Sequence, residues 1–222
     1  MDKEHRRGDS LLLSTLIEVW ETNSLTLRTI EHLTMFGIAI VLASIIGVFL
    51  GLFLYSRPKI AHPMLNLLNL VETIPDIPLL VLLLPIFGLG SGPTIVASVL
   101  YSLLPITRNT YTGLKEVDLK YVDIARAMGL SERDILFKVR IPLSLPMIVG
   151  GLRIALVFTM GVVTLGGLIA AGGLGAALIA GIQLYKINTI LVAGLWTGLL
   201  AVIFDGLAGI VEKRLQKRYG IW

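Results

Sequence analysis

Few residues of this chain have types and placements that could do chemistry. Four charged residues lie inside otherwise apolar stretches, namely Glu72, Asp76, Arg153 and Asp205. Charges in such surroundings are costly and mark ion pairs or transport paths. Glu72 and Asp76 are four residues apart, so one helix would present both on one face. We predict a path for a charged solute along Glu72, Asp76 and Asp205. The alternative is that these acids pair with Arg153 or Arg108.

Aromatic residues could complete such a path, because the face of an aromatic ring attracts cations. Tyr101 is the candidate that we include in the path. Packing or anchoring at the membrane interface is the alternative role for this ring.

No catalytic or metal-binding pattern is evident. A Gly-x-x-x-x-Gly-Lys-Ser/Thr phosphate loop is absent, so any ATP hydrolysis must occur in another polypeptide. The glycines at 166–167 and 172–175 follow an apolar stretch, which indicates close helix packing or an outer loop. The three histidines are far apart, and there is no cysteine. Since no basic patch alternates with aromatics, nucleic-acid binding is not indicated either.

The composition excludes a soluble enzyme. The 222 residues are 55% hydrophobic and only 15% charged, with a mean hydropathy of +0.84. Soluble domains carry about 25% charged residues. We therefore predict an all-α integral membrane protein, because helices satisfy their own backbone groups in lipid.

Five spanning helices fit between the charges. Spans are predicted over residues 33–55, 64–87, 93–114, 142–171 and 187–211. If residues 56–63, 108–140 and 212–222 share one side, that side holds 13 of the 19 basic residues. The positive-inside rule then places the C-terminus in the cytoplasm and the N-terminus outside.

The chain divides into three parts on this basis. Residues 1–31 form an extracytoplasmic segment, 32–215 the transmembrane domain and 216–222 a cytoplasmic tail. Within the first part, apolar residues recur at helical spacing, which favours an amphipathic helix on the membrane surface: Leu13, Leu16, Ile17 and Trp20.

The long cytoplasmic loop is predicted to contain a two-helix hairpin over residues 118–141. Asp118 can cap a first helix, and Gly129 suits the left-handed residue that ends it. Ser131 and Asp134 have capping-box spacing for a second helix, which Pro142 should end. Such a hairpin could enter a partner's groove or could pack on its own membrane helices. The residue pattern leaves both open.

This segment resembles the "EAA" signature of ABC importer permeases. Asp123-Ile-Ala-Arg-Ala-Met-Gly129 is followed by Val139-Arg-Ile-Pro142 at the spacing of that signature. Ala125, Gly129 and Pro142 are kept, whereas Asp123 replaces the glutamate and Ile124 the first alanine. The resemblance implies that the hairpin couples the membrane domain to an ATPase, through Asp123, Ala125, Arg126, Gly129, Glu132, Arg133 and Pro142.

The resemblance extends over about residues 25–215. The segments 72–78, 85–90, 104–114 and 171–175 are similar to those of permeases for glycine betaine, carnitine and choline, a subgroup sharing the methionine-importer fold with five core helices. It implies a bacterial cell-membrane complex with a second permease subunit, two ATPase subunits that bind ATP and Mg, and an extracytoplasmic binding protein. The permease itself would carry no cofactor.

Three alternatives remain open on the sequence. Methionine or another small amino acid could be the substrate of the same fold. An ion-coupled secondary transporter would use Glu72, Asp76 and Asp205 to bind its coupling ion, but it leaves the 118–141 hairpin unexplained. A membrane enzyme or assembly factor is disfavoured because no nucleophile, base or metal constellation is present.

Overall fold

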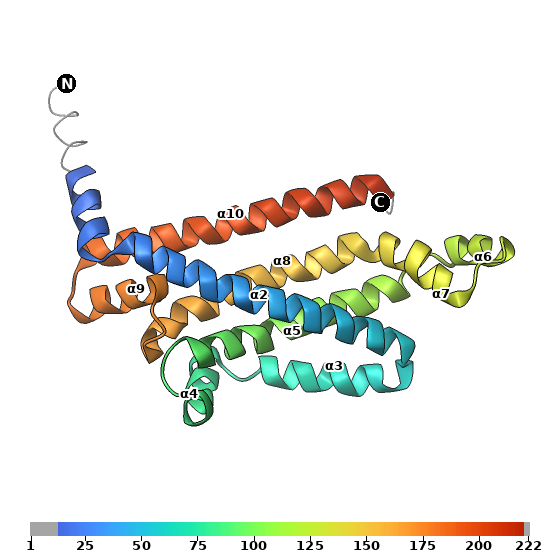
Figure 1. The fold of residues 1–222 in the computed structure, drawn as a ribbon, viewed down its shortest axis with the longest axis horizontal. Helices are drawn as coiled ribbons and strands as arrows, with labels where there is room; N and C mark the ends of the chain where they lie inside the picture. The colour runs from blue at the N-terminus through green and yellow to red at the C-terminus, as the bar shows by residue number, and fades with distance from the viewer. Residues whose placement is uncertain (1–12, 220–222) are drawn as a thin grey trace, which may run out of the picture. The chain divides into compact units, whose positions relative to one another are not determined.

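The computed structural model describes residues 13–219, and these are helical with no strand (Figure 1). A helix over residues 13–22 comes first. It is followed by α2 (Leu25–Ser56), α3 (Pro58–Glu72), α4 (Asp76–Phe87), α5 (Ser91–Lys115), α6 (Leu119–Ala127), α7 (Glu132–Ile135), the π-helical turn η1 (Leu136–Arg140), α8 (Ile141–Leu165), the 3₁₀ turn η2 (Gly166–Ile169), α9 (Gly173–Gln183) and α10 (Ile187–Tyr219). The predicted all-α class is confirmed.

Three helical segments are long and apolar enough to cross a membrane. They are α2, the continuous segment Glu132–Ile169 and α10, and the pair α3 and α4 would add a fourth span if it crosses as one. The predicted third span corresponds to α5, which has 25 residues but includes Ser, Thr, Asn and Arg side chains. The five-span count therefore stays a prediction that depends on α5.

The predicted second span is broken rather than continuous. Helix α3 ends at Glu72 and α4 begins at Asp76, so the expectation that these two acids share one helix face is wrong. Pro75 lacks a backbone N–H and disfavours the helical conformation of Ile74 before it. The Tyr101 hydroxyl donates a hydrogen bond to the Ile74 carbonyl at this break. Glu72 and Asp76 thus lie on either side of an unwound turn.

Pro142 does not end the second hairpin helix, contrary to the sequence-based expectation. The chain runs from α7 through η1 into α8 without leaving helical conformation. Proline normally clashes with the carbonyl four residues before it. In η1 the turn is widened, as the Ile141 N–H donates to the Leu136 carbonyl five residues back. This π-helical turn lets the helix accept proline, so the second helix of the hairpin and the fourth predicted span form one continuous element.

The described chain divides into two compact units, and several long helices contribute residues to both. The first comprises residues 13–38, 76–97 and 160–201. In it, the helix over residues 13–22 packs Trp20 edge-to-face on Trp196, with ring centroids 5.3 Å apart. The predicted N-terminal helix is therefore present, with Leu13, Leu16 and Ile17 exposed.

Helix α9 in the first unit was not expected from the sequence. Its first amide, on Gly173, donates to the Glu31 carboxylate at 2.8 Å. A Cβ on Gly175 would overlap the Thr164 carbonyl oxygen, so the backbones touch there. Close helix packing, one of the two interpretations of these glycines, is therefore confirmed.

The second unit comprises residues 39–75, 98–159 and 202–219 of the described chain. Ala43, Ile106 and Ala155 form a buried apolar core that joins α2, α5 and α8. Gly51 and Gly151 allow backbones to approach, since a Cβ at either position would clash with α5 atoms at 2.5 to 2.6 Å. Small residues thus bring these helices together and position the hairpin at their ends.

Candidate functional site

The hairpin formed by α6, α7 and η1 begins as the sequence predicts. The Asp118 carboxylate accepts a hydrogen bond from the Lys120 N–H at 2.9 Å and caps α6. At the other end Gly129 has φ +81°, and its N–H donates to the Arg126 carbonyl while the Leu130 N–H donates to Ala125. This pair of bonds is the Schellman motif, in which a left-handed residue ends a helix. Both predicted signals are confirmed.

The start of α7 also matches its capping prediction. The Ser131 hydroxyl accepts a hydrogen bond from the Asp134 N–H at 3.2 Å. The Asp134 carboxylate pairs with Lys138 at 2.6 Å. Hydrogen bonds from Lys138 and Ser131 lower the pKa of Asp134 below its ordinary 3.8, since they favour the charged carboxylate.

The hairpin has an apolar core of its own. Val122 and Ala125 from α6 pack with Ile135 from α7 and with Val117 from the preceding linker. Leu130, Val139 and Leu143 cover this cluster. Because α6 and α7 bury their apolar faces against each other, the hairpin is a preformed two-helix knob.

Arg126 joins the two helices on the outside of the hairpin. Its guanidinium binds the Glu132 carboxylate at 2.9 Å and the Asp123 carboxylate at 3.4 Å. Hydrogen bonding to Glu132 is the first cause that raises the pKa of Arg126. Asp123, Arg126 and Glu132, three of the predicted coupling residues, are thus brought into one ion-pair group.

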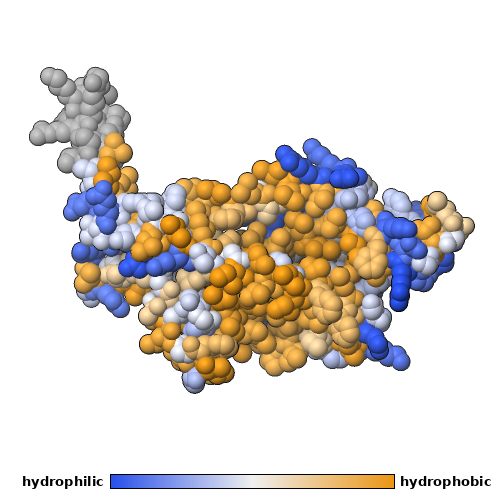
Figure 2. All heavy atoms as spheres, viewed as in Figure 1, coloured by the Kyte–Doolittle hydropathy of each residue, from blue (hydrophilic) through white to orange (hydrophobic). Residues whose placement is uncertain are grey.

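Apolar side chains project from the hairpin into solvent. Met128 is 74% exposed and Phe137 is 64% exposed, and Leu119 and Ile124 are also exposed. Charged residues of the hairpin are exposed among them, and Figure 2 shows hydrophilic and apolar residues side by side on this element. Exposed apolar groups within a polar rim are the arrangement of a protein interface. The hairpin therefore has the features of a docking element.

Arg140 ties the base of the hairpin to two membrane helices. Its guanidinium donates a hydrogen bond to the Leu114 carbonyl at 2.9 Å, near the end of α5. It also lies over the Tyr55 ring of α2, 5.4 Å from the ring centroid. A cation at the last carbonyls of a helix is favourable. Sequence reasoning missed Arg140, although a basic residue in the last turn before a predicted span was a signal.

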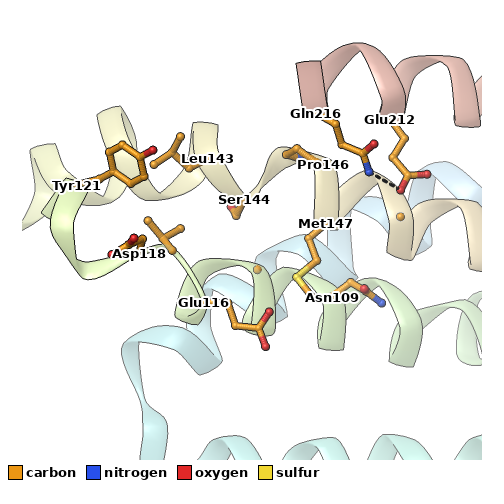
Figure 3. A pocket seen from close by; sticks show the side chains of 13 residues that line it. Asn109, Glu116, Asp118, Tyr121, Leu143, Ser144, Pro146, Met147, Glu212 and Gln216 are labelled. Atoms are coloured by element: carbon orange, nitrogen blue, oxygen red, sulfur yellow. Dashed lines mark hydrogen bonds between the residues drawn. The ribbon is translucent and has the colours of Figure 1, made fainter. Parts of the chain in front are cut away.

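A cavity of about 590 Å³ lies beside the hairpin, between α5, α8 and α10 (Figure 3). Polar groups line much of it, including Asn109, Glu116, Asp118, Glu212 and Gln216. The Gln216 amide donates to the Glu212 carboxylate at 3.3 Å. The C-terminal part of α10 thus lies across the cavity from the start of the hairpin.

Arg153 and Asp205 form an ion pair, one of the alternatives open from the sequence. The guanidinium of Arg153 on α8 binds both carboxylate oxygens of Asp205 on α10 at 2.9 Å. Glu212, also on α10, binds the same guanidinium at 2.8 Å. Glu212 follows Asp205 by seven residues, or two helical turns, and this spacing was the signal that sequence reasoning overlooked.

The ion pairs of Arg153 are with Asp205 and Glu212, and neither Glu72 nor Asp76 takes part in them. Tyr101 is buried and bonded to the Ile74 carbonyl, while Glu72 and Asp76 flank the break and are half-buried. The path role of Glu72, Asp76, Tyr101 and Asp205 stays a prediction. Within residues 13–219, no three His, Asp or Glu side chains gather in a metal-binding arrangement.

Residues 34–217 match the protein family described as the inner membrane component of binding-protein-dependent transport systems. The chain belongs to this family, and it is therefore a multi-pass protein of the cell membrane and a translocation component, not an enzyme.

Curated relatives are similar over most of their length. The carnitine transport permease protein OpuCD of Listeria monocytogenes is 34% identical, covering 92% of this chain and 93% of the relative. The choline transport system permease protein OpuBB of Bacillus subtilis is 32% identical, with 90% and 93% covered. The osmoprotectant import permease protein OsmW of Salmonella typhimurium is 39% identical, with 81% and 86% covered.

The fold also matches solved transporters. An inward-facing conformation of the MetNI methionine ABC transporter aligns with a TM-score of 0.76 and 25% identity, covering 86% of this chain and 96% of that chain. An amino acid ABC transporter structure with histidines aligns with a TM-score of 0.72 at 17% identity, which shows the fold alone. The predicted methionine-importer fold is therefore confirmed.

Proposed function

We propose that this chain is the permease subunit of an ATP-driven importer for quaternary-amine osmoprotectants such as carnitine, choline and glycine betaine. The observation that carries the proposal is the 34% identity, over 92% of the chain, to a permease named for carnitine transport. Relatives named for choline and for several osmoprotectants are similar at comparable identity. Substrate would pass from a binding protein across the membrane by alternating access.

The α6–α7 hairpin is the element that we assign to coupling with a separate ATPase. It is preformed by its own core, carries exposed Met128 and Phe137, and continues through η1 into α8. A rigid knob continuous with a membrane helix can convert closure of an ATPase pair into movement of that helix. ATP and Mg would bind in the ATPase subunits, two of which would serve a pair of permease subunits.

The orientation in this proposal follows the basic residues. The hairpin and the C-terminus would face the cytoplasm, and the loop between α9 and α10 would face outward toward the binding protein. The cavity beside the hairpin and the Arg153 ion pairs would then lie toward the cytoplasmic half.

Methionine is a less well supported substrate than the quaternary amines. The match to the methionine transporter has 25% sequence identity, whereas several permeases with osmoprotectant names reach 32% to 39%. An ion-coupled transporter would have no use for a docking hairpin, and Asp205 is held by Arg153.

Reconstitution tests the proposal directly. The permease, its ATPase and its binding protein would be placed in proteoliposomes, and uptake of labelled glycine betaine, choline, carnitine and methionine measured with and without ATP. We expect ATP-dependent uptake of one or more quaternary amines. ATP-independent uptake driven by an ion gradient, or uptake of methionine alone, would contradict it.

A hairpin variant tests the coupling role in the same vesicles. Gly129→Asp places a charged side chain on the exposed left-handed turn. We expect weak ATPase association or loss of ATP-dependent uptake, with membrane insertion intact. Normal uptake by this variant would refute the coupling assignment.

A further inference from the structure

Tyr185 occupies a backbone position that favours glycine. Helix α9 ends in the same hydrogen-bond pattern as α6: the Lys186 N–H donates to the Gly181 carbonyl at 2.8 Å, and the Tyr185 N–H donates to Ile182 at 3.2 Å. Tyr185 therefore holds the left-handed position of a Schellman motif, with φ +53°. In α6 this position is Gly129. An aromatic residue there is strained because its Cβ crowds the backbone.

The ring of Tyr185 has no packing role that would explain this strain. The residue is 89% exposed, and Leu184 and Ile187 beside it are exposed as well. Together Leu184, Tyr185 and Ile187 form an apolar tip between α9 and α10. Strained residues persist where the conformation serves a function. The conformation here projects an aromatic ring away from its own unit.

A polar hollow adjoins this tip. Its volume is about 330 Å³, and Tyr185 and Ile187 line it together with the polar side chains Thr15, Glu18, Asn23 and Asn188. An aromatic anchor beside polar groups is the arrangement of a protein interface. Acyl chains would not match the hollow, because they would remove water from the charged Glu18 and the polar Asn188.

Helix α10 separates the tip from the basic C-terminal residues, and the positive-inside rule places those residues in the cytoplasm and the tip outside. Its 33 residues correspond to about 50 Å, enough to cross a membrane once. The C-terminal end of α10 shares a cavity with the start of the hairpin, through Gln216 and Asp118. The tip directly precedes α10, so one crossing separates it from that end. A soluble partner on its side is the substrate-binding protein for which the family is named.

We infer that Tyr185 is an anchor that docks the extracytoplasmic substrate-binding protein, with its ring entering an apolar pocket of that protein and the adjacent hollow accepting polar groups. This inference rests on the proposed function. It assigns the docking contact to a residue whose removal should relieve backbone strain. Stability and docking are therefore expected to change in opposite directions.

The test uses Tyr185→Gly in the full importer, with Tyr185→Trp as the aromatic replacement. Ala170→Gly is the matched control, because Ala170 is also exposed and left-handed, at φ +61°, but carries no ring. Complexes in nanodiscs would be titrated with the binding protein, and apparent melting temperatures measured in detergent. We expect Tyr185→Gly to weaken docking about tenfold or more, with a melting temperature equal to or above that of the wild type. Tyr185→Trp and Ala170→Gly should dock as the wild type does.

The outcomes separate this inference from the proposed function. If the wild-type complex neither docks the binding protein nor imports substrate, the proposed function fails. If the wild type works and Tyr185→Gly docks equally well, the inference is overturned. Equal weakening by Ala170→Gly would also overturn it, since loop flexibility would then be the cause. Reduced membrane insertion with normal docking would identify Tyr185 as a lipid anchor and refute the docking role.

Discussion

Arg126 and Arg153 are each bound by two carboxylates, in very different surroundings. Arg126 binds Glu132 at 2.9 Å and Asp123 at 3.4 Å on the exposed hairpin. Arg153 binds Asp205 at 2.9 Å and Glu212 at 2.8 Å, on apolar helices that reach into the membrane. The chemical groups are the same, but the first set lies on the exposed hairpin, whereas the second lies between two apolar helices and lines a cavity.

The comparison shows that surroundings decide what an ion pair contributes. An exposed pair is screened by water and salt and stabilises the fold little. A pair that lies less exposed between apolar helices is screened less, so removing one partner leaves charges that are poorly compensated. We therefore expect Arg126 to align α6 with α7 and to contribute to the exposed surface of the hairpin. We expect Arg153 to hold α8 and α10 together.

Removing the Arg153 charge should have the largest effect. Arg153→Leu leaves the carboxylates of Asp205 and Glu212 without their shared cation, and we expect the apparent melting temperature to fall by about 5 °C or more. Thermal unfolding in detergent and the yield of inserted protein measure this loss. Arg153→Lys keeps the charge without the two-pronged geometry and should be intermediate. If Arg153→Leu melts at the same temperature as the wild type, the ion pairs of Arg153 stabilise the fold no more than those of Arg126 do.

Backbone strain in the hairpin should come next. Gly129→Val forces a β-branched residue into the left-handed conformation, at a cost of about 1–2 kcal/mol. Since no atom beyond Gly129 and its two chain neighbours lies within 4 Å of the position that a Cβ would take, the cost comes from the backbone conformation and not from packing against other residues. We expect α7 to be displaced and ATP-dependent uptake to fall several-fold. Gly129→Asn is the control, because asparagine tolerates this conformation, and it should retain most uptake. Equal loss in both variants would argue against the conformational cause.

Substitutions of Arg140 test the connection between the hairpin and the membrane helices α2 and α5. Arg140→Gln removes the cation over Tyr55 and weakens the bond to Leu114. We expect about two- to fivefold less substrate imported per ATP hydrolysed, as an effect of about 0.5–1 kcal/mol on coupling would produce. Tyr55→Leu should act in the same direction and Tyr55→Phe should not. Lys115→Gln is a matched control, since Lys115 also lies over a ring, that of Tyr111. Unchanged import per ATP in Arg140→Gln would show that the contacts of Arg140 with Tyr55 and Leu114 have no role in coupling.

Protonation of Asp134 should have the smallest effect. Its pKa is lowered in the folded hairpin by Lys138 and Ser131, so its contribution to stability is present above the unfolded-state pKa. The contribution is lost as the pH falls through the folded pKa, which lies below the ordinary 3.8. The melting temperatures of the wild type and Asp134→Asn should thus differ slightly at neutral pH and converge in strong acid. A difference that grows below about pH 4 would contradict this sign.

Local signals of the hairpin were predictable because each depends on neighbouring residues. Asp118 and Ser131 cap helices through bonds spanning two or three positions, and Gly129 is suited to its turn by its own lack of a side chain. Pro142 was misjudged for a related reason. Its clash is local, but the widened turn of η1 that relieves it depends on how the whole α7–α8 segment is held.

The sequence by itself determined the membrane class, the apolar helices α2, α8 and α10, and the capped hairpin, because hydropathy and capping act over a few residues. Only the tertiary structure decided which acids Arg153 binds, 52 and 59 residues away, and that Glu72 and Asp76 lie on separate helices. It also decided that Tyr185 is left-handed and exposed. These outcomes depend on contacts between distant segments, whose pairing no local pattern encodes.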